Sequence, residues 1–116
     1  MDIIVPDTSV IIQGKLSEMI KLGKIKDCKI VIPIAVLDEL QAQASKNRVE
    51  GFIGLRELKN LREECSKKGI DLTYEGERPS LEDIKLARSG RIDSIIRDVA
   101  KKKNGTLVTS DLVQAL

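Results

Sequence analysis

The sequence predicts a single α/β domain built on a parallel sheet with right-handed crossovers. Three short apolar runs, at residues 3–5, 29–32 and 106–109, are rich in β-branched side chains and nearly continuous. Continuous apolar character is typical of strands covered on both faces, as in parallel sheets. Segments with helical periodicity separate these runs, and strands that alternate with helices of ten or more residues favour this fold class.

Apolar spacing predicts two helices between the second and third runs. Residues 36–40 open the first helix. The second is longer and ends with two lysines in its last turn and Gly69 just beyond it, which is a common helix terminus. Gly51 and Gly54 near its start either permit close helix packing or loosen the helix. Its predicted apolar stripe consists of Phe52, Leu55, Leu58, Leu61 and Cys65.

The second half of the chain continues the alternation. Residues 71–74 predict a further short strand. The pattern at 79–83 resembles a capping box, which predicts a helix over 81–88. Residues 104–105, Asn-Gly, are a turn signal before the last strand. The helix before that turn is predicted from an apolar stripe of Ile92, Ile95, Ile96, Val99 and Ala100.

Length and composition are those of one domain, residues 1–116. With 116 residues and 41% hydrophobic side chains, the chain can build one core but not two. The net charge of +2 permits a polyanionic partner without requiring one. The chain stops soon after a helix begins at Asp111. We therefore expect it to be an N-terminal fragment of a longer protein.

Missing residue types exclude several kinds of chemistry. The chain has no His and two Cys, which excludes His or Cys₄ zinc sites, serine or cysteine triads and histidine-dependent nucleases. No leader or apolar run long enough for a membrane span is present, so we expect reduced thiols in a cytoplasmic protein. One Phe, one Tyr and no Trp do not make the aromatic platforms of RRM or OB-type single-strand binders.

Acidic residues follow the predicted strands. In an open parallel sheet, ligands bind beyond the carboxyl ends of the strands. Asp7 follows the first strand, Glu39 lies in the second turn of the helix after the second, and Asp111 follows the last. Asp93 is expected in the first turn of a helix that begins near Arg91. Four acids from separate segments are thereby directed toward one edge of the sheet.

Each acid alone has a simpler explanation. Asp7, Asp93 and Asp111 lie near helix starts, where aspartate commonly caps free N–H groups, and Glu39 alone suits a solvated helix surface. Four crowded carboxylates, however, repel one another unless a cation neutralises them. Mg²⁺ and Mn²⁺ are the cations that oxygen-only ligands suit. Such sites hydrolyse phosphodiesters, because the ions activate water and stabilise the leaving oxygen.

The same segments resemble the four acidic motifs of PIN (PilT N-terminus) domains, in order and over essentially the whole chain. The motifs are Val5-Pro6-Asp7-Thr8-Ser9, Val36-Leu37-Asp38-Glu39-Leu40, Gly90-Arg91-Ile92-Asp93-Ser94 and Leu107-Val108-Thr109-Ser110-Asp111. Within that superfamily, segments such as 10–14, 51–55, 76–79 and 109–116 are most similar to the N-terminal PIN domain of archaeal PIN-domain ATPases. In those proteins a PilT-like ATPase ring and a KH-type nucleic-acid module follow.

The resemblance implies a three-layer α/β/α sandwich with a central parallel sheet, whose final strand is missing by truncation. It implies a Mg²⁺- or Mn²⁺-dependent nuclease whose catalytic, metal-binding acids are Asp7, Glu39, Asp93 and Asp111. Ser9 and Thr109 would support that site with their hydroxyls. Single-stranded RNA is the expected substrate, with structured or branched DNA left open. The implied partners are nucleic acid and covalently linked ATPase and KH-type domains, and a homo-oligomer is allowed.

A second interpretation is kept beside the nuclease. The domain would then be a docking or assembly module of a larger PilT-like ATPase, with little or no nuclease activity. Other α/β families fit worse, because a haloacid-dehalogenase phosphatase needs an aspartate where Ser9 stands. The motifs of a response-regulator receiver and the Gly-rich nucleotide loop cannot be placed either.

Neighbouring polar residues carry weaker predictions. By helical geometry Asp98 and Asp38 should point away from the site. Thr8 is either a turn hydroxyl or a site group. Lys46 and Arg48 are candidates for guiding a phosphate backbone toward the acids, because an acidic metal cleft needs flanking cations to attract a polyanion.

Overall fold

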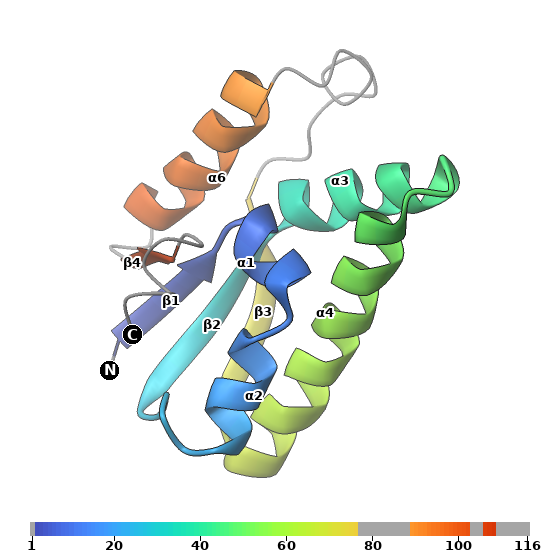
Figure 1. Ribbon diagram of the computed structural model, residues 1–116. Coiled ribbons are helices and arrows are strands. Elements are labelled where there is room, and N and C mark those ends of the chain that lie inside the picture. The colour runs from blue at the N-terminus through green and yellow to red at the C-terminus, as the bar shows by residue number, and fades with distance from the viewer. Residues whose placement is uncertain (1, 77–88, 103–105, 109–116) are drawn as a thin grey trace.

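The structure, a computed structural model, describes residues 2–76, 89–102 and 106–108 (Figure 1). Within these ranges the strands form one sheet in the order β3-β2-β1-β4, and every pairing is parallel. The predicted strands and the parallel sheet are confirmed. The strands are β1 (Asp2–Pro6), β2 (Cys28–Pro33), β3 (Asp71–Glu75) and β4 (Thr106–Val108).

Helices cover both faces of the sheet, which confirms the α/β/α sandwich. Figure 1 shows α1, α2 and α4 on one side of the sheet and α6 on the other. None of the helices within the described ranges has the length and apolar character needed to cross a membrane. The helices are α1 (Thr8–Gln13), α2 (Leu16–Lys21), α3 (Ile34–Ser45), α4 (Val49–Lys68) and α6 (Ser89–Lys102).

Alternate residues of the strands build two cores. Ile30 and Ile32 of β2 join the larger core with α1, α2, α3 and α4. Val31 between them packs instead with Val99 and Ala100 of α6. This two-sided burial is the reason the strands read as continuous apolar runs, since successive side chains of a strand point to opposite faces.

The register aligns the carboxyl ends of the strands. Ile4 of β1 pairs with Ile30 of β2, which in turn pairs with Leu72 of β3. β1 leads directly into α1 through Asp7, and β2 leads directly into α3. The N-termini of these two helices therefore meet at one edge of the sheet, the edge at which the sequence predicts a site.

Glycines let α3 and α4 pack closely. A Cβ at Gly51 would overlap the backbone of Ala44, whose Cα would lie 2.8 Å away, and a Cβ at Gly54 would overlap the Leu40 side chain. Of the two alternatives for these glycines, close packing is therefore the correct one. The buried line of α4 begins with them, and the predicted stripe is wrong for Phe52, which is 53% exposed.

Other predictions differ from the structure near the ends of elements. The start of α1 was predicted at Asp7, but the extent of α1 and the whole of α2 were not, because six residues are too few to show helical periodicity. Helix α6 is described from Ser89, so Asp93 lies in its second turn rather than its first. The predicted helix at 81–88, the turn at 104–105 and the segment 109–116 lie outside the described residues.

Candidate functional site

Asp7 lies at the junction between β1 and α1 and is the N-cap of α1. Its Oδ1 accepts hydrogen bonds from the Val10 N–H at 3.0 Å and from the Ser9 hydroxyl at 2.7 Å. The capping explanation for Asp7 is therefore correct. Both of these bonds use Oδ1, so Oδ2 is the oxygen of this carboxylate that remains outside the cap. The same residue can thus cap α1 and offer an oxygen to a cation.

Glu39 comes from α3 and reaches the start of α1. The Thr8 hydroxyl donates a hydrogen bond of 2.8 Å to Oε2 of Glu39. Because Thr8 directly follows Asp7, this bond brings the two acidic segments together. Thr8 and Glu39 are 31 residues apart in the sequence. Of the two interpretations left open for Thr8, the site group is the one that the structure favours. Sequence reasoning had no signal that would have chosen between them.

The structure does not describe the side chains of the remaining predicted site residues. Asp93 lies on α6, which contacts α3, β1, β2 and β4, but its side chain is outside the described part of the chain. Thr109 and Asp111 lie outside it altogether. The structure thus brings Asp7, Ser9 and Glu39 to one edge through Thr8. The convergence of Asp93, Asp111 and Thr109 on the same edge stays a prediction.

The donor chemistry at this edge suits a hard divalent cation. The described side chains there are two carboxylates and two hydroxyls, and the chain has no His to supply a nitrogen ligand. Among residues whose side chains are described, no group of three or more acids, cysteines or histidines could hold a metal ion. A complete ligand set would therefore need Asp93 or Asp111.

The structure shows how exposed the residues of the weaker predictions are, and the role of Lys46 and Arg48 as guides for a polyanion stays a prediction. Lys46 and Arg48 are exposed in the connection between α3 and α4, where a polyanion can reach them. Asp98 is exposed on α6, as expected for an acid that faces away from the site. Asp38 is half-buried next to Glu39 on α3.

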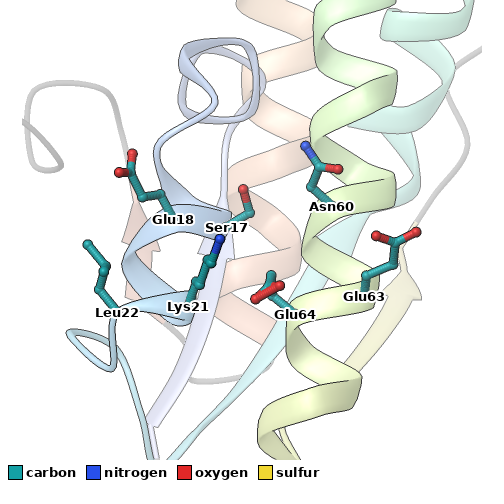
Figure 2. Close-up of a pocket in the computed structure, with 7 residues that line it drawn as sticks. All are labelled: Ser17, Glu18, Lys21, Leu22, Asn60, Glu63 and Glu64. Carbon is teal, nitrogen blue, oxygen red and sulfur yellow. The ribbon is translucent and has the colours of Figure 1, made fainter.

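A second cluster of acids lies between α2 and α4, and sequence reasoning missed it. Figure 2 shows the pocket there, with a volume of about 370 Å³. No residue of the predicted site lines it. The lining residues are Ser17, Glu18, Lys21, Leu22, Asn60, Glu63 and Glu64.

Glu57 of α4 is buried and contacts the first turn of α2 next to this pocket. Its carboxylate accepts hydrogen bonds from the Ser17 N–H at 2.9 Å and from the Ser17 hydroxyl at 2.7 Å. Lys15, at the N-cap of α2, makes no capping bond with its side chain. Glu57 therefore caps α2 from another helix. Burial raises the pKa of Glu57, while the hydrogen bonds from Ser17 and Leu16 act in the opposite direction.

Comparison with known proteins agrees with the fold and covers nearly the whole chain. A family model described as PIN domain matches residues 4–115. The chain is 46% identical to a solved structure titled as a domain of a functionally unknown protein from Methanocaldococcus jannaschii. That match has a TM-score of 0.90 and covers 98% of this chain and 81% of the other.

Two curated relatives are much longer than this chain. An uncharacterized KH and PIN-domain containing protein of Methanocaldococcus jannaschii is 49% identical over 108 residues, which are 93% of this chain and 17% of that protein. An uncharacterized PIN and TRAM-domain containing protein of Bacillus subtilis is 34% identical over 109 residues, which are 90% of this chain and 27% of that protein. The chain thus spans less than a third of the length of either relative.

Proposed function

Because the chain belongs to the PIN domain family, we propose that it is a metal-dependent nuclease domain that hydrolyses phosphodiester bonds of nucleic acid. The observation that carries the proposal is the hydrogen bond from Thr8 to Glu39, which joins the Asp7 and Glu39 segments at the carboxyl edge of the sheet. Carboxylates that converge on one edge of a sheet repel one another, and their oxygens suit Mg²⁺ or Mn²⁺ as the neutralising cation.

In this proposal Asp7 and Glu39 bind the cation together with Asp93 and Asp111. Ser9 donates to Oδ1 of Asp7 and Thr8 donates to Oε2 of Glu39, so that these two hydroxyls orient the two carboxylates. Thr109 would support the site in the same way.

A bound divalent ion supplies an activated water and stabilises the charge on the leaving oxygen. In the proposed hydrolysis a water oxygen would form a bond to phosphorus while the bond from phosphorus to the 3′ oxygen breaks. The products are a 5′-phosphate and, after protonation, a 3′-hydroxyl.

Single-stranded RNA is the proposed substrate, with structured or branched DNA as the alternative. The KH and TRAM names of the two longer relatives support a nucleic-acid substrate. By the same reasoning the whole protein would carry further nucleic-acid-binding domains. An ATPase domain in it remains a hypothesis that comes from the resemblance of the sequence alone.

The test is cleavage of end-labelled single-stranded RNA, single-stranded DNA and branched DNA in Mg²⁺, Mn²⁺ and EDTA. Asp7→Asn and Glu39→Gln should abolish cleavage that the wild type performs with metal. Glu18→Gln, which neutralises an exposed acid of α2, is the matched control and should cleave normally. Metal-dependent cleavage that survives in both site variants would overturn the assignment of these acids.

The second candidate is a docking module with little or no nuclease activity. The small share of each relative that this chain spans favours it, because the activity of the whole protein can reside elsewhere. A folded wild type that binds Mn²⁺ but cleaves none of the three substrates would support this candidate. The next measurement would then use the whole protein.

A further inference from the structure

Both aromatic residues of the chain are exposed in part, one on α4 and one on β3. The sequence contains one Phe and one Tyr and no Trp. Phe52 on α4 is 53% exposed and Tyr74 on β3 is 39% exposed. Exposed aromatic rings are costly to keep in contact with water and are the groups on which single-stranded bases stack. The composition alone predicted no aromatic platform for bases, whereas the structure leaves both rings partly exposed.

Tyr74 forms one wall of a groove between α3, α4 and β3. The groove has a volume of about 280 Å³, so it is small and suits a single planar group rather than a large ligand. Its floor is apolar, and two cationic side chains lie at its rim. We call it the Tyr74 groove, and it is lined by Leu37, Leu55, Leu58, Lys59, Arg62 and Tyr74.

Cations and Phe52 continue from the groove along α4. Residues 52, 55, 59 and 62 are three or four positions apart, which places them on one face of α4, and Arg48 is the N-cap of that helix. We call this face the α4 stripe, and it consists of Arg48, Phe52, Leu55, Lys59 and Arg62. The salt bridge between Lys67 and Glu64 of α4 lies outside this stripe. The stripe is thus a positive surface with an aromatic ring.

The groove opens at the same level of the sheet as the acidic site. Tyr74 pairs with Ile32, near the carboxyl end of β2. From the register, Tyr74 lies level with Pro6, the last residue of β1 before Asp7, and β2 lies between them. Two strand spacings are about 10 Å. A single strand of nucleic acid that crosses this edge can therefore reach both places within a few nucleotides.

We propose that the α4 stripe and the Tyr74 groove bind single-stranded nucleic acid, with one base against Tyr74 and the phosphates along Arg48, Lys59 and Arg62. This inference rests on the proposed function, since it identifies where the substrate of the nuclease lies. Bases are available to an aromatic ring only when they are unpaired, so the surface selects single strands over duplexes. Phe52 offers a second stacking position farther along the strand.

Binding is tested without cleavage, in EDTA. The probe is a fluorescein-labelled oligouridylate of about twelve nucleotides, and its anisotropy reports binding. An unlabelled oligouridylate should also quench the intrinsic fluorescence, because Tyr74 is the chain's one tyrosine and there is no tryptophan. A duplex of the same length should bind at least tenfold more weakly. Equal binding of the duplex, or no binding of the single strand, would overturn the proposal.

Variants separate stacking from charge. Tyr74→Leu should weaken binding about fivefold or more, whereas Tyr74→Phe, which keeps the ring, should bind as the wild type does. The pair Lys59→Gln and Arg62→Gln should make the dependence of log K on log salt less steep by about 1.4, since each phosphate contact of a single strand contributes about 0.7. Circular dichroism establishes that each variant is folded.

The matched control neutralises two exposed lysines elsewhere, Lys21→Gln with Lys24→Gln. If it weakens binding as much as the stripe variants do, the surface is not specific and the inference fails. Failure of the nuclease proposal gives a different result from failure of this inference. In that case cleavage persists in Asp7→Asn, while binding of the oligonucleotide in EDTA is unaffected. A partner protein that needs the same residues, with no oligonucleotide bound, would also overturn the inference.

Discussion

The hydroxyl of Thr8 donates a hydrogen bond of 2.8 Å to the carboxylate of Glu39, and thereby joins the start of α1 to the middle of α3. The bond fixes one oxygen of Glu39 next to the segment that carries Asp7. It links the two acidic segments, and it makes Thr8 a positioning residue in the proposed nuclease site.

Thr8→Val should weaken Mn²⁺ binding about tenfold or more and slow cleavage, because the isosteric side chain no longer orients Glu39. Calorimetric titration with Mn²⁺ measures the affinity directly. Thr73→Val is the matched control, since it removes a similar half-buried hydrogen bond of 2.9 Å, from Thr73 to Glu75 on β3. Equal Mn²⁺ affinity in the Thr8 variant and the wild type would contradict this role.

Asp7 has two roles that different substitutions separate. Asp7→Asn keeps a good N-cap, so its melting temperature should stay close to that of the wild type while cleavage is lost. Asp7→Ala should lose the cap as well, at a cost of about 1 kcal/mol. Thermal unfolding followed by circular dichroism checks both. A large loss of stability in the Asn variant would show that its charge, not its cap, holds α1 in place.

Glu57→Ala should destabilise the fold by about 2–4 kcal/mol, although this position looks like an ordinary surface acid in the sequence. The substitution leaves the Ser17 N–H and hydroxyl without their buried acceptor and uncaps α2. Urea unfolding measures the loss. Glu63→Ala, at an exposed position of the same helix, is the control and should change stability by less than about 0.5 kcal/mol.

The stability that Glu57 confers should fall as the pH rises. Burial raises its pKa above the ordinary 4.5, so the folded chain holds this proton more tightly than the unfolded chain does. The contribution of this proton to the free energy of unfolding is complete below about pH 4.5, and it is lost as the pH rises through the pKa of Glu57 in the folded chain. Glu57→Gln lacks this titration. Its free energy of unfolding should therefore improve relative to the wild type between about pH 4 and pH 7, and a constant difference would contradict the assignment.

The thiols should react slowly in the folded protein. Cys65 is 1% exposed and Cys28 is 4% exposed. Burial, with smaller contributions from Cys28 and Glu64, raises the pKa of Cys65 to about 11. At pH 8 about one Cys65 in a thousand is then a thiolate. Labelling with a thiol-specific reagent should be slow until urea unfolds the chain, and equal rates in both states would show that the core opens readily.

Gly51→Ala should destabilise the α3–α4 pair even though alanine favours a helix, because its Cβ meets the backbone of Ala44, which cannot move aside. Gly54→Ala meets the Leu40 side chain instead and should cost less. Adding Leu40→Val should recover part of the stability that Gly54→Ala loses, and none of the stability that Gly51→Ala loses. Urea unfolding of the single and double variants measures this difference.

Much of the fold was predictable because its signals are local. The strands 3–5 and 29–32 are read from their own β-branched residues, and the end of α4 from Gly69, whose φ of 69° suits glycine. At the candidate site, Asp7 and Glu39 were both predicted to lie at one sheet edge, and the bond from Thr8 to Glu39 joins their segments there. The partner that joins them was not, since nothing near Thr8 in the sequence points to residue 39.

The sequence by itself determined the strands, the longer helices and the class of an α/β domain, because these signals come from residues within a few positions of one another. The tertiary structure alone decided which side chains are buried or paired. It left Phe52 exposed to solvent. It buried Glu57 against Ser17, 40 residues away in the sequence, and joined Thr8 to Glu39, 31 residues away. Such contacts depend on how the helices pack over the sheet, and no local pattern records that packing.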